Sequence, residues 1–454
     1  MNQKDRKTEM YKDIYFIGIG GIGMSAIARY YNAKGFRVSG YDKTPSPLTK
    51  ALEGEGIAIH YEDNINFVPK DINDTLVVYT PAIPKDMGEL SYVQEKGYKV
   101  IKRSRMLGEI AQGQRCMAVA GTHGKTTTST LVSHLFTASG EGCSAFLGGI
   151  SKNYDSNLLI SSNDVVVAEA DEFDRSFLQL FPEIAVITSM DADHLDIYGD
   201  EAHIREAFKA FASQVSGTVI VKHGLDITSK DTKAEIKTYS FGNPESDFHA
   251  EALEGGHFNI HYPGGVIEDC VLGIPGWVNI ENATGAAAIA LTYGINPDKI
   301  KEALASFSGV KRRFDIQVRQ QDKVYIDDYA HHPEEISAAL SSIRNSYPSM
   351  KLTAIFQPHL YTRTRDFAPE FAKALSKADK LILLDIYPAR EEPIPGVTSE
   401  IIFKDVTCGE KVLLRRSELM EYLADEPLEL VVTLGAGDID RFVGDIADML
   451  KNRG

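Results

Sequence analysis

The chain alternates short apolar runs with longer stretches that have the periodicity of helices. β-Branched and aromatic residues fill the runs, as at residues 14–17 and 76–79, and residues 24–32 follow the first run with a helical pattern. Strands that alternate with helices from end to end are typical of parallel sheets with crossover helices. The pattern therefore predicts an α/β protein.

Three sections of this pattern each begin a new sheet, and we take them as domains of residues 1–112, 113–311 and 312–454. Helices are expected at 283–290 and 300–307. The expected strands lie at 14–17, 36–39, 76–79, 116–120, 165–168, 184–188, 324–327, 352–355, 381–384 and 430–433. In the first section they are spaced as in a doubly wound sheet.

Length and charge narrow the possibilities further. A chain of 454 residues exceeds the size of about 250–300 residues at which one core stops growing. The 64 acidic residues outnumber the 48 basic ones, and a net charge of -16 repels a phosphate backbone, which argues against a nucleic-acid partner. The sequence has no apolar run of membrane-spanning length and begins with polar residues, so we expect a cytoplasmic protein without a membrane partner.

The first glycine cluster follows the strand at 14–17 and contains Gly18, Gly20, Gly21 and Gly23, with Met24 and Ser25 behind them. Such glycines let the backbone approach a pyrophosphate at a helix N-terminus. Asp42 follows the next strand, where a carboxylate accepts hydrogen bonds from sugar hydroxyls. These residues fit a nicotinamide or flavin enzyme and a UDP-sugar binder equally well.

The second glycine cluster again stands between a strand and a helix. It contains Gly121, Thr122, His123, Gly124, Lys125, Thr126 and Thr127. Val119 takes the place of the first glycine of a full phosphate loop, but the other parts are present. Backbone amides would hold phosphates, Lys125 would contact the β and γ oxygens, and the Thr126 hydroxyl would bind Mg²⁺. We therefore predict an ATP site.

Carboxylates follow two further strands of the second section. Glu172 comes shortly after residues 165–168, and His194 lies in an acidic run after residues 184–188. The carboxyl ends of parallel strands share one edge of a sheet, and Mg²⁺ prefers hard oxygen ligands. We therefore expect Glu172 and His194 to join Thr126 as metal ligands beside the phosphate loop.

Together these motifs resemble those of a known family. The sequences at 121–128, 169–172 and 193–196 look like those of the Mur ligases, which add amino acids to UDP-N-acetylmuramic acid. Residues 18–25 and 327–333, with the Phe-Gln-Pro-His sequence that begins at Phe356, most resemble the branch that adds L-alanine.

The resemblance implies three domains: a Rossmann-like UDP-binding domain, a central P-loop ATPase-like domain and a C-terminal Rossmann-like α/β domain. It also implies a reaction in peptidoglycan synthesis: ATP-dependent ligation of L-alanine to the carboxylate of UDP-N-acetylmuramate through an acyl phosphate, with Mg²⁺. On this basis the first glycine cluster binds a UDP-sugar. The resemblance leaves open a monomer or a homodimer.

Further residues are assigned by the resemblance alone. Asn279 and Asn282 would contact adenine and its surroundings, Arg313 a phosphate, and Asp327 the ribose. Tyr329, His331 and Arg363 would orient L-alanine, and His331 is our candidate for the base that deprotonates its amine. Without the resemblance, His331 would pass for part of a helix start and Arg363 for a surface cation.

The sequence departs from the family pattern at three places. Val278 stands where relatives often have His, and Leu360 stands where they commonly have Arg, which puts a two-arginine clamp on the alanine carboxylate in question. Phe208 falls where some sister enzymes carry a modified lysine, and Lys209 is one residue away, so the sequence leaves open whether a modified lysine takes part.

Other functions stay open at the level of sequence. The nearest alternative is a recycling ligase that attaches an intact tripeptide to the same UDP-sugar, and folate and cyanophycin ligases are more distant. An NAD-dependent oxidoreductase would explain Gly18 and Asp42 but not Lys125. A non-catalytic nucleotide switch would explain Lys125 but not the acidic strand ends.

Overall fold

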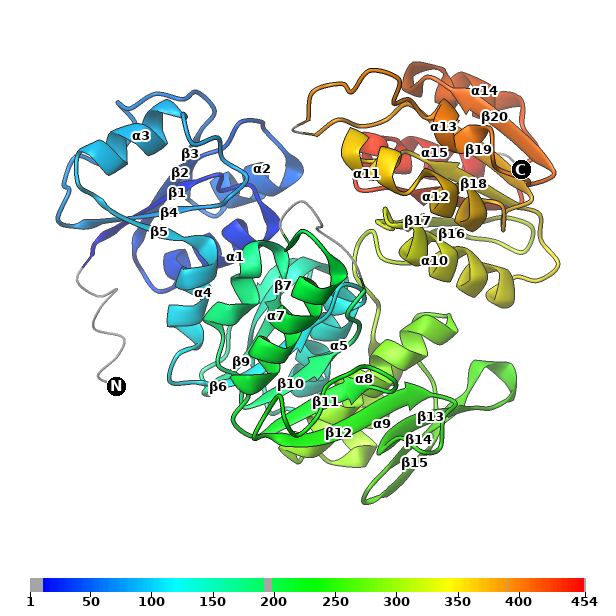
Figure 1. The fold of residues 1–454 in the computed structure, drawn as a ribbon, viewed down its shortest axis with the longest axis horizontal. Coiled ribbons are helices and arrows are strands. Elements are labelled where there is room, and N and C mark those ends of the chain that lie inside the picture. The colour runs from blue at the N-terminus through cyan, green and yellow to red at the C-terminus, as the bar shows by residue number, and fades with distance from the viewer. Residues whose placement is uncertain (1–10, 192–197, 390, 453–454) are drawn as a thin grey trace. The chain divides into compact units, whose positions relative to one another are not determined.

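The computed structural model describes residues 11–191, 198–389 and 391–452. Its contacts divide the chain into two compact units, Met1–Gly273 with Ile280–Ser308, and Ile274–Asn279 with Gly309–Gly454. The described residues form three separate sheets, two in the first unit and one in the second (Figure 1). This confirms the three-sheet α/β architecture, and the boundaries at 112/113 and 311/312 stay predictions.

The first sheet has five parallel strands in the order β3-β2-β1-β4-β5, which is a doubly wound arrangement. Both faces of β1 are buried, with Ile14 and Phe16 in one core cluster and Tyr15 and Ile17 in another. Its elements are β1 (Asp13–Ile17), α1 (Ile22–Ala33), β2 (Arg37–Tyr41), α2 (Pro47–Gly54), β3 (Ala58–His60), β4 (Thr75–Tyr79), α3 (Gly88–Glu95), β5 (Lys99–Lys102) and α4 (Arg103–Ala111).

The second sheet has ten strands in the order β15-β14-β13-β12-β11-β10-β6-β9-β7-β8. Its centre is parallel, but β8, β14 and β15 pair antiparallel at the two edges. Its strands are β6 (Arg115–Ala120), β7 (Ser144–Ser151), β8 (Ser156–Leu159), β9 (Val165–Ala170), β10 (Ile184–Ile187), β11 (Thr218–Lys222), β12 (Glu235–Phe241), β13 (Phe248–Ala252), β14 (Phe258–Tyr262) and β15 (Gly265–Cys270). Its helices include α5 (Lys125–Ala138), the 3-10 helix η2 (Phe173–Gln179), α7 (Glu201–Ser213), α8 (Trp277–Tyr293) and α9 (Pro297–Ser306).

The third sheet has six strands in the order β16-β17-β21-β18-β19-β20, and only the β16–β17 pair is antiparallel. Its strands are β16 (Asp315–Arg319), β17 (Val324–Asp328), β18 (Leu352–Phe356), β19 (Lys380–Leu384), β20 (Glu410–Leu414) and β21 (Leu430–Leu434). The helices are α10 (Pro333–Ser346), α11 (Tyr361–Asp366), α12 (Ala368–Leu375), α13 (Glu400–Phe403), α14 (Leu419–Asp425) and α15 (Val443–Asn452).

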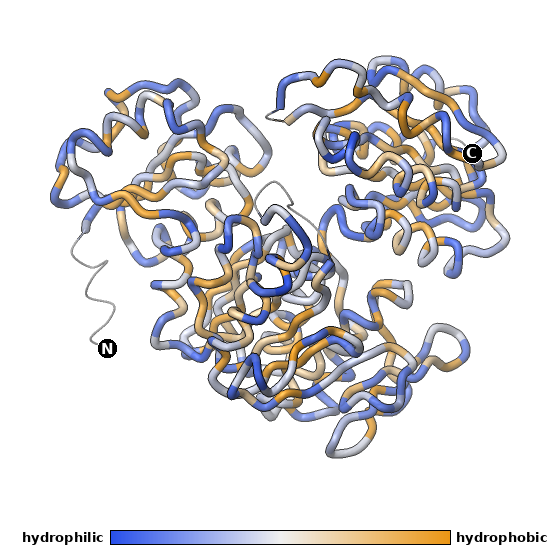
Figure 2. Tube along the Cα trace, viewed as in Figure 1, coloured by the Kyte–Doolittle hydropathy of each residue, from blue (hydrophilic) through white to orange (hydrophobic). Residues whose placement is uncertain are grey.

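Hydropathy follows this architecture, because the hydrophobic segments coincide with the central strands (Figure 2). Tyr325, Ile355 and Val431, for example, are fully buried in the third sheet. Across the described ranges, no helix combines the length and the apolar character that a membrane span requires.

Two differences from the expected elements matter for the site. Strand β9 continues through Glu169 to Ala170, because it pairs with β6 along its full length, so Glu169 lies on the strand and not after it. The helix expected at 283–290 is longer, and it begins at Trp277 directly after Gly276, whose φ is +104°. Asn279 and Asn282 are therefore helical residues.

Candidate active site

The phosphate loop connects the end of β6 with the start of α5. Gly121 has φ +139° and Gly124 has φ +80°, both in the region that favours glycine. A Cβ atom on Gly121 would lie 2.0 Å from the Thr188 Oγ1 atom. The loop therefore approaches the tip of β10 so closely that only glycine fits at this position.

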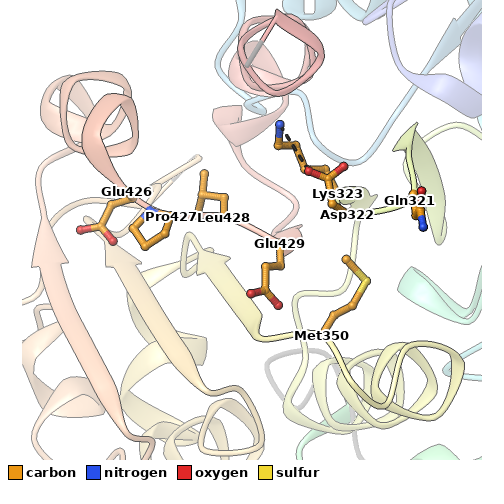
Figure 3. Close-up of a pocket in the computed structure, with 8 residues that line it drawn as sticks. All are labelled: Gln321, Asp322, Lys323, Met350, Glu426, Pro427, Leu428 and Glu429. Carbon is orange, nitrogen blue, oxygen red and sulfur yellow. Dashed lines mark ion pairs between the residues drawn. The ribbon is translucent and has the colours of Figure 1, made fainter. Parts of the chain in front are cut away.

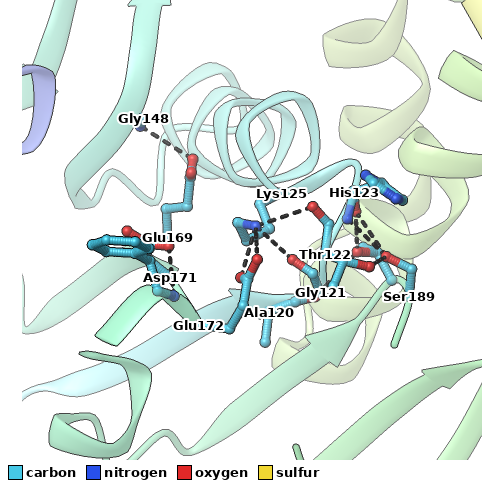
Figure 4. A network of polar contacts seen from close by, with 12 residues as sticks. Ala120, Gly121, Thr122, His123, Lys125, Gly148, Glu169, Asp171, Glu172 and Ser189 are labelled. Atoms are coloured by element: carbon cyan, nitrogen blue, oxygen red, sulfur yellow. Dashed lines mark hydrogen bonds and ion pairs between the residues drawn. The ribbon is translucent and has the colours of Figure 1, made fainter. Parts of the chain in front are cut away.

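Two hydroxyl side chains that follow β10 form hydrogen bonds with the phosphate loop. The Ser189 Oγ atom lies 2.8 Å from Thr122 Oγ1 and accepts a 2.7 Å hydrogen bond from the His123 amide. The Thr188 hydroxyl donates to the His123 carbonyl. Figure 4 shows Ser189 beneath Thr122 and His123. These bonds fix the backbone of the loop, which is the arrangement that phosphate binding by amides requires.

Lys125 is the first residue of α5 and its ammonium group turns back into the loop. Its Nζ donates to the carbonyl of Gly121 at 2.6 Å and to that of Thr122 at 3.2 Å. It also forms an ion pair with Glu172, 2.8 Å from Nζ to Oε2 (Figure 4). Burial alone would lower the pKa of Lys125, but the nearby carboxylates, Glu172 foremost, raise it well above its usual value.

Glu169 is a second carboxylate at this loop, and it was not among the predicted site residues. Its Oε1 accepts from the Thr126 hydroxyl at 3.2 Å, and its Oε2 accepts from the Gly148 amide at 3.2 Å. A Cβ atom on Gly148 would lie 2.4 Å from the carboxylate oxygens. The Thr126 hydroxyl, predicted to bind metal, is thus already linked to a carboxylate.

The oxygen donors of this region suit Mg²⁺. Thr126, Glu169 and Glu172 provide one hydroxyl and two carboxylates around the phosphate loop, and Mg²⁺ prefers such hard ligands. His194, the third predicted ligand, lies outside the described residues. Within the described ranges, no group of three or more His, Cys, Asp or Glu side chains forms a metal cluster by itself. The metal site therefore stays a prediction.

Asn282 also approaches the phosphate loop. A Cβ atom on Gly124 would lie 2.9 Å from the Asn282 Oδ1 atom, so this side chain covers the loop glycine. Asn279, one turn earlier on α8, donates a 2.6 Å hydrogen bond to the Pro275 carbonyl. The structure thus brings Asn282 to the loop and uses Asn279 to fix the start of the helix.

The first glycine loop leads into α1. Gly21 is the N-cap of α1, and no side chain caps the helix there, so the amides of its first turn are available to an anion. Asp42 Oδ2 accepts a 2.7 Å hydrogen bond from the Gly20 amide, and Oδ1 accepts from the Thr44 amide at 3.2 Å. Asp42 therefore holds the loop in shape, and its contact with a sugar hydroxyl stays a prediction.

Arg103, at the start of α4, is a candidate site residue that the sequence did not reveal. A Cβ atom on Gly23 would lie 2.6 Å from Arg103 Nη1, so the guanidinium occupies the space that a larger residue would need. Its Nη2 lies 3.1 Å from Asp171 Oδ2, next to Glu172. A cation therefore stands between the first glycine loop and the acidic end of β9.

In the second unit, Asp327 is fully buried at the end of β17. Its carboxylate accepts from the Thr433 hydroxyl at 2.7 Å and from Arg312 Nε at 3.3 Å. Burial raises the pKa of Asp327, and Arg312 opposes that rise. In this position Asp327 anchors Arg312, and its contact with a ribose stays a prediction.

The candidate alanine-binding residues follow β17. The Arg313 guanidinium carbon lies 4.8 Å from the centre of the Tyr329 ring. The ring centroids of Tyr329 and His331 are 5.3 Å apart, and those of His331 and His359 are 6.0 Å apart. His331 Nδ1 lies 3.0 Å from the Tyr329 carbonyl and 3.3 Å from Glu335 Oε2. The structure thus groups Tyr329, His331 and Arg313, and adds His359 to them.

Arg363 lies on α11, which begins directly after Leu360. Leu360 has φ +72°, a backbone conformation that is strained for a branched side chain. Arg363 is partly buried, whereas Arg365 is exposed and pairs with Asp366 at 2.7 Å. The two arginines of α11 therefore differ in their exposure to solvent.

Comparison with known proteins gives one consistent result. The models named Mur ligase family, catalytic domain; Mur ligase middle domain; and Mur ligase, glutamate ligase domain match residues 13–115, 119–290 and 312–437. The UDP-N-acetylmuramate–L-alanine ligase of Parabacteroides distasonis is 50% identical, covering 96% of this chain and 97% of that protein. The chain belongs to the Mur ligase family.

Other comparisons of this Mur ligase agree. The UDP-N-acetylmuramate–L-alanine ligase of Porphyromonas gingivalis is 49% identical, covering 97% of this chain and 99% of that protein. The structure of the UDP-N-acetylmuramate–alanine ligase of Thermotoga maritima has a TM-score of 0.82 at 26% identity, covering 97% of this chain and 100% of the other. A murein peptide ligase of Psychrobacter arcticus has a TM-score of 0.73 at 22% identity, covering 98% and 99%, and shares the fold.

A pocket of about 480 Å³ in the C-terminal domain of this Mur ligase is lined by eight residues, none of which is a predicted site residue (Figure 3). Its walls precede β17, β18 and β21, at the amino ends of these strands, whereas Asp327 and Tyr329 lie at the carboxyl end. Ligands of parallel sheets bind at the carboxyl ends. We therefore assign this pocket no part in the reaction.

Proposed function

We propose that this chain joins L-alanine to the carboxylate of UDP-N-acetylmuramate in peptidoglycan synthesis and converts ATP to ADP and phosphate. The observation that carries the proposal is the similarity, at 50% identity over nearly the whole chain, to a relative named for this reaction. The braced phosphate loop with Lys125 agrees with ATP use. We also propose that the reaction takes place in the cytoplasm, and the lack of a helix of membrane-spanning character among the described residues is consistent with that.

The first step is phosphoryl transfer. An oxygen of the muramyl carboxylate attacks the γ-phosphorus of ATP, the bond from that phosphorus to the β–γ bridging oxygen breaks, and an acyl phosphate and ADP result. The protein contributes position and positive charge in such a step. The Lys125 ammonium would leave Glu172 and contact the phosphate oxygens, while the amides of the loop hold the rest of the chain of phosphates.

Thr126, Glu169 and Glu172 would hold Mg²⁺, with His194 as a further ligand. The metal would neutralise charge that gathers on the phosphate oxygens. Glu172 is paired with Lys125, so both partners must change contacts when the metal and ATP bind. The ion pair keeps both groups charged in a nearly buried site until that exchange occurs.

The first glycine loop would bind the diphosphate of the UDP-sugar. The free amides at the start of α1 favour an anion, and the Arg103 guanidinium beside Gly23 adds a positive charge. Asp171 orients Arg103 through a 3.1 Å ion pair. Arg103 would thereby stand beside the sugar nucleotide and next to the acidic strand end that carries Glu172.

The second step is attack of the neutral alanine amine on the acyl carbon, which forms the amide and releases phosphate. A base must take up the proton of the ammonium form. His331, held by the Tyr329 carbonyl and by Glu335, is our candidate for it. Arg363 would bind the alanine carboxylate, because a guanidinium matches a carboxylate in shape and charge.

Phosphate release tests the proposal. Purified protein with ATP, Mg²⁺ and UDP-N-acetylmuramate is supplied with L-alanine, glycine, L-serine or the intact tripeptide in turn. We expect release with L-alanine far above that with the tripeptide, and a product whose mass equals UDP-N-acetylmuramate plus alanine less one water. Preference for the tripeptide would instead identify a recycling ligase. Turnover of NAD without ATP would identify an oxidoreductase.

A further inference from the structure

Asn157 of the middle-domain sheet is completely buried against the helix that follows the first glycine loop. It lies on β8, and its side chain forms three hydrogen bonds with residues of α1. Its Nδ2 donates to the Ile22 carbonyl at 2.6 Å and to Ser25 Oγ at 2.9 Å. Its Oδ1 accepts from the Arg29 guanidinium. All donors of the amide are used.

The partners fix how this amide is oriented. Arg29 can only donate and the Ile22 carbonyl can only accept, so the oxygen of Asn157 must face Arg29 and the nitrogen must face Ile22. Arg29 is itself held by Glu55, 2.7 Å from Nη2 to Oε1. Asn157 therefore binds a fixed surface of the N-terminal domain in one orientation.

The contacts fall on the turn of α1 that would meet the substrate. Ile22 is the first residue of α1, and the Ser25 amide donates to the Gly21 carbonyl at 2.8 Å. The amides of this turn are the ones available to an anion. Loss of the Asn157 contacts would release the turn from the middle domain without removing any group that contacts the substrate.

The other strand of the same hairpin is linked through Glu169 to the helix that follows the phosphate loop. β8 pairs antiparallel with β7, and Gly148 on β7 donates its amide to Glu169, which accepts from Thr126. The hairpin therefore contacts α1 directly through Asn157, and it is linked to Thr126, the second residue of α5, through Glu169 of β9.

We propose that Asn157, a residue of the ATP-binding domain, is a positioning residue. It holds the UDP-sugar loop of the N-terminal domain in the position that ligand binding requires. The inference rests on the proposed function, because it takes the loop at Gly18 to be the UDP-sugar site. Asn157 does not contact the substrate. It holds the first turn of α1 in the position where the amides of that turn meet the diphosphate.

The sharpest variant is Asn157→Asp, which has almost the same size. Above pH 7 its carboxylate still accepts from Arg29 but cannot donate to Ile22 and repels its carbonyl. We expect the Kd of UDP-N-acetylmuramate, from isothermal titration calorimetry, to rise about tenfold or more. The KM for UDP-N-acetylmuramate should rise in parallel, while kcat and the KM for ATP stay within about twofold.

Asn163→Ala is the matched control. Asn163 lies in the same domain and also makes three hydrogen bonds, two donated to the carbonyls of Glu141 and Gly142 and one accepted from the Val165 amide. None of them involves α1. We expect Asn163→Ala to lower the melting temperature without changing the Kd for the UDP-sugar.

Asn157→Ala serves as a second variant, since it removes the contacts without adding a charge. The proposal is overturned if both Asn157 variants bind UDP-N-acetylmuramate as the unchanged protein does, or if the KM for ATP rises as much as that for the UDP-sugar. Ser25→Ala, which removes one contact of Asn157, should show a smaller effect that is less than additive with Asn157→Ala. Failure of the unchanged protein to bind UDP-N-acetylmuramate would contradict the proposed function instead.

Discussion

Lys125 and Glu172 form a nearly buried ion pair, 2.8 Å from Nζ to Oε2, with their side chains 13% and 2% exposed. The lysine belongs to the phosphate loop and the glutamate follows β9, so the pair joins two neighbouring strand ends of the middle sheet. Removal of either partner leaves a buried charge without its counterion, which is costly. The pair therefore has consequences for both catalysis and stability.

Lys125→Ala should abolish phosphoryl transfer while it preserves binding of the UDP-sugar. We expect phosphate release to fall by about a thousandfold or more, because the lysine supplies positive charge to the transferred group. Calorimetry should give an unchanged Kd for UDP-N-acetylmuramate. Lys12→Ala, at an exposed lysine that pairs with Asp74, is the control. Near-normal ATP turnover in Lys125→Ala would contradict the assignment.

The same ion pair predicts a pattern in stability. Lys125→Met alone should lower the free energy of unfolding by about 3–5 kcal/mol, because Glu172 is left charged in a buried site. Lys125→Met combined with Glu172→Gln removes both charges and should recover much of that loss without recovering activity. Urea unfolding of the single and double variants measures this. Equal stability of the two would show that Glu172 has another counterion.

Glu169→Ala tests the second carboxylate of the phosphate loop. Glu169 accepts from the hydroxyl of Thr126, so its loss should weaken metal binding at that hydroxyl. We expect the Mg²⁺ concentration for half-maximal activity to rise about tenfold or more. Glu268→Ala, at an exposed glutamate of β15, should leave it unchanged. An unaltered magnesium dependence in Glu169→Ala would restrict Glu169 to a structural role.

Gly121→Ala tests how closely the loop approaches β10. The added Cβ atom would lie 2.0 Å from Thr188 Oγ1 at a φ of +139°, so we expect a loss of about 2–4 kcal/mol in unfolding free energy and a raised KM for ATP. Gly140→Ala, at φ +89° with open space around its Cβ, isolates the backbone cost of about 1 kcal/mol. Its KM for ATP should not change.

How much of this site is visible in sequence depends on how local each contact is. The strand, the glycines and Lys125 of the phosphate loop are neighbours in the chain, so their order alone predicts the loop. Arg103 beside Gly23 and Asn157 beside Ile22 are different, because their contacts join residues far apart in sequence. These contacts depend on how helices pack against strands, which cannot be predicted from a local sequence pattern.

The edges of the sheets were also missed, for a related reason. Strands such as β14 and β15 carry partly or fully exposed residues on one side and lack the continuous apolar run of a central strand. Central parallel strands such as β1, β6 and β10 were predicted because their continuous apolar runs are buried on both faces, whereas β11, which is also buried and parallel, was missed. Glu169 was read as a loop residue because a charged side chain is unusual inside a strand, yet β9 continues through it.

Asp328 predicts a pH dependence of stability in the C-terminal domain. Burial raises the pKa of Asp328 from 3.8 to about 6, against the opposing effects of Arg313 and of the amides of Phe314 and Ala330. Between these values the folded state binds more protons than the unfolded state, so this group makes the protein less stable as pH rises from about 4 to about 6.

Asp328→Asn removes the titration. The difference in unfolding free energy between the unchanged protein and this variant should fall by roughly 2–3 kcal/mol from pH 4 to pH 7 and stay constant above that. Asp322→Asn, at an exposed residue of the β16–β17 turn, should show no such slope. Denaturant unfolding at a series of pH values measures both. A difference that does not vary with pH would contradict the raised pKa.

Arg363 and Arg365 allow a matched test of the alanine site, because both lie on α11 but differ in their surroundings. Arg363 is partly buried, whereas Arg365 is exposed and paired with Asp366. Leu360 stands where a second arginine is common in the family, so a single guanidinium should bind the alanine carboxylate. A charge-assisted contact of this kind contributes about 1.5–3 kcal/mol.

Arg363→Ala should therefore raise the KM for L-alanine by about tenfold to a hundredfold, with the KM for ATP and for the UDP-sugar nearly unchanged. Arg365→Ala should leave all three constants near their original values, since it loses only an exposed ion pair. Steady-state assays with each substrate varied in turn separate the two arginines. If Arg365→Ala raises the KM for L-alanine and Arg363→Ala does not, the alanine carboxylate binds on the opposite side of α11. The strained backbone at Leu360 then has no part in placing Arg363 for alanine binding.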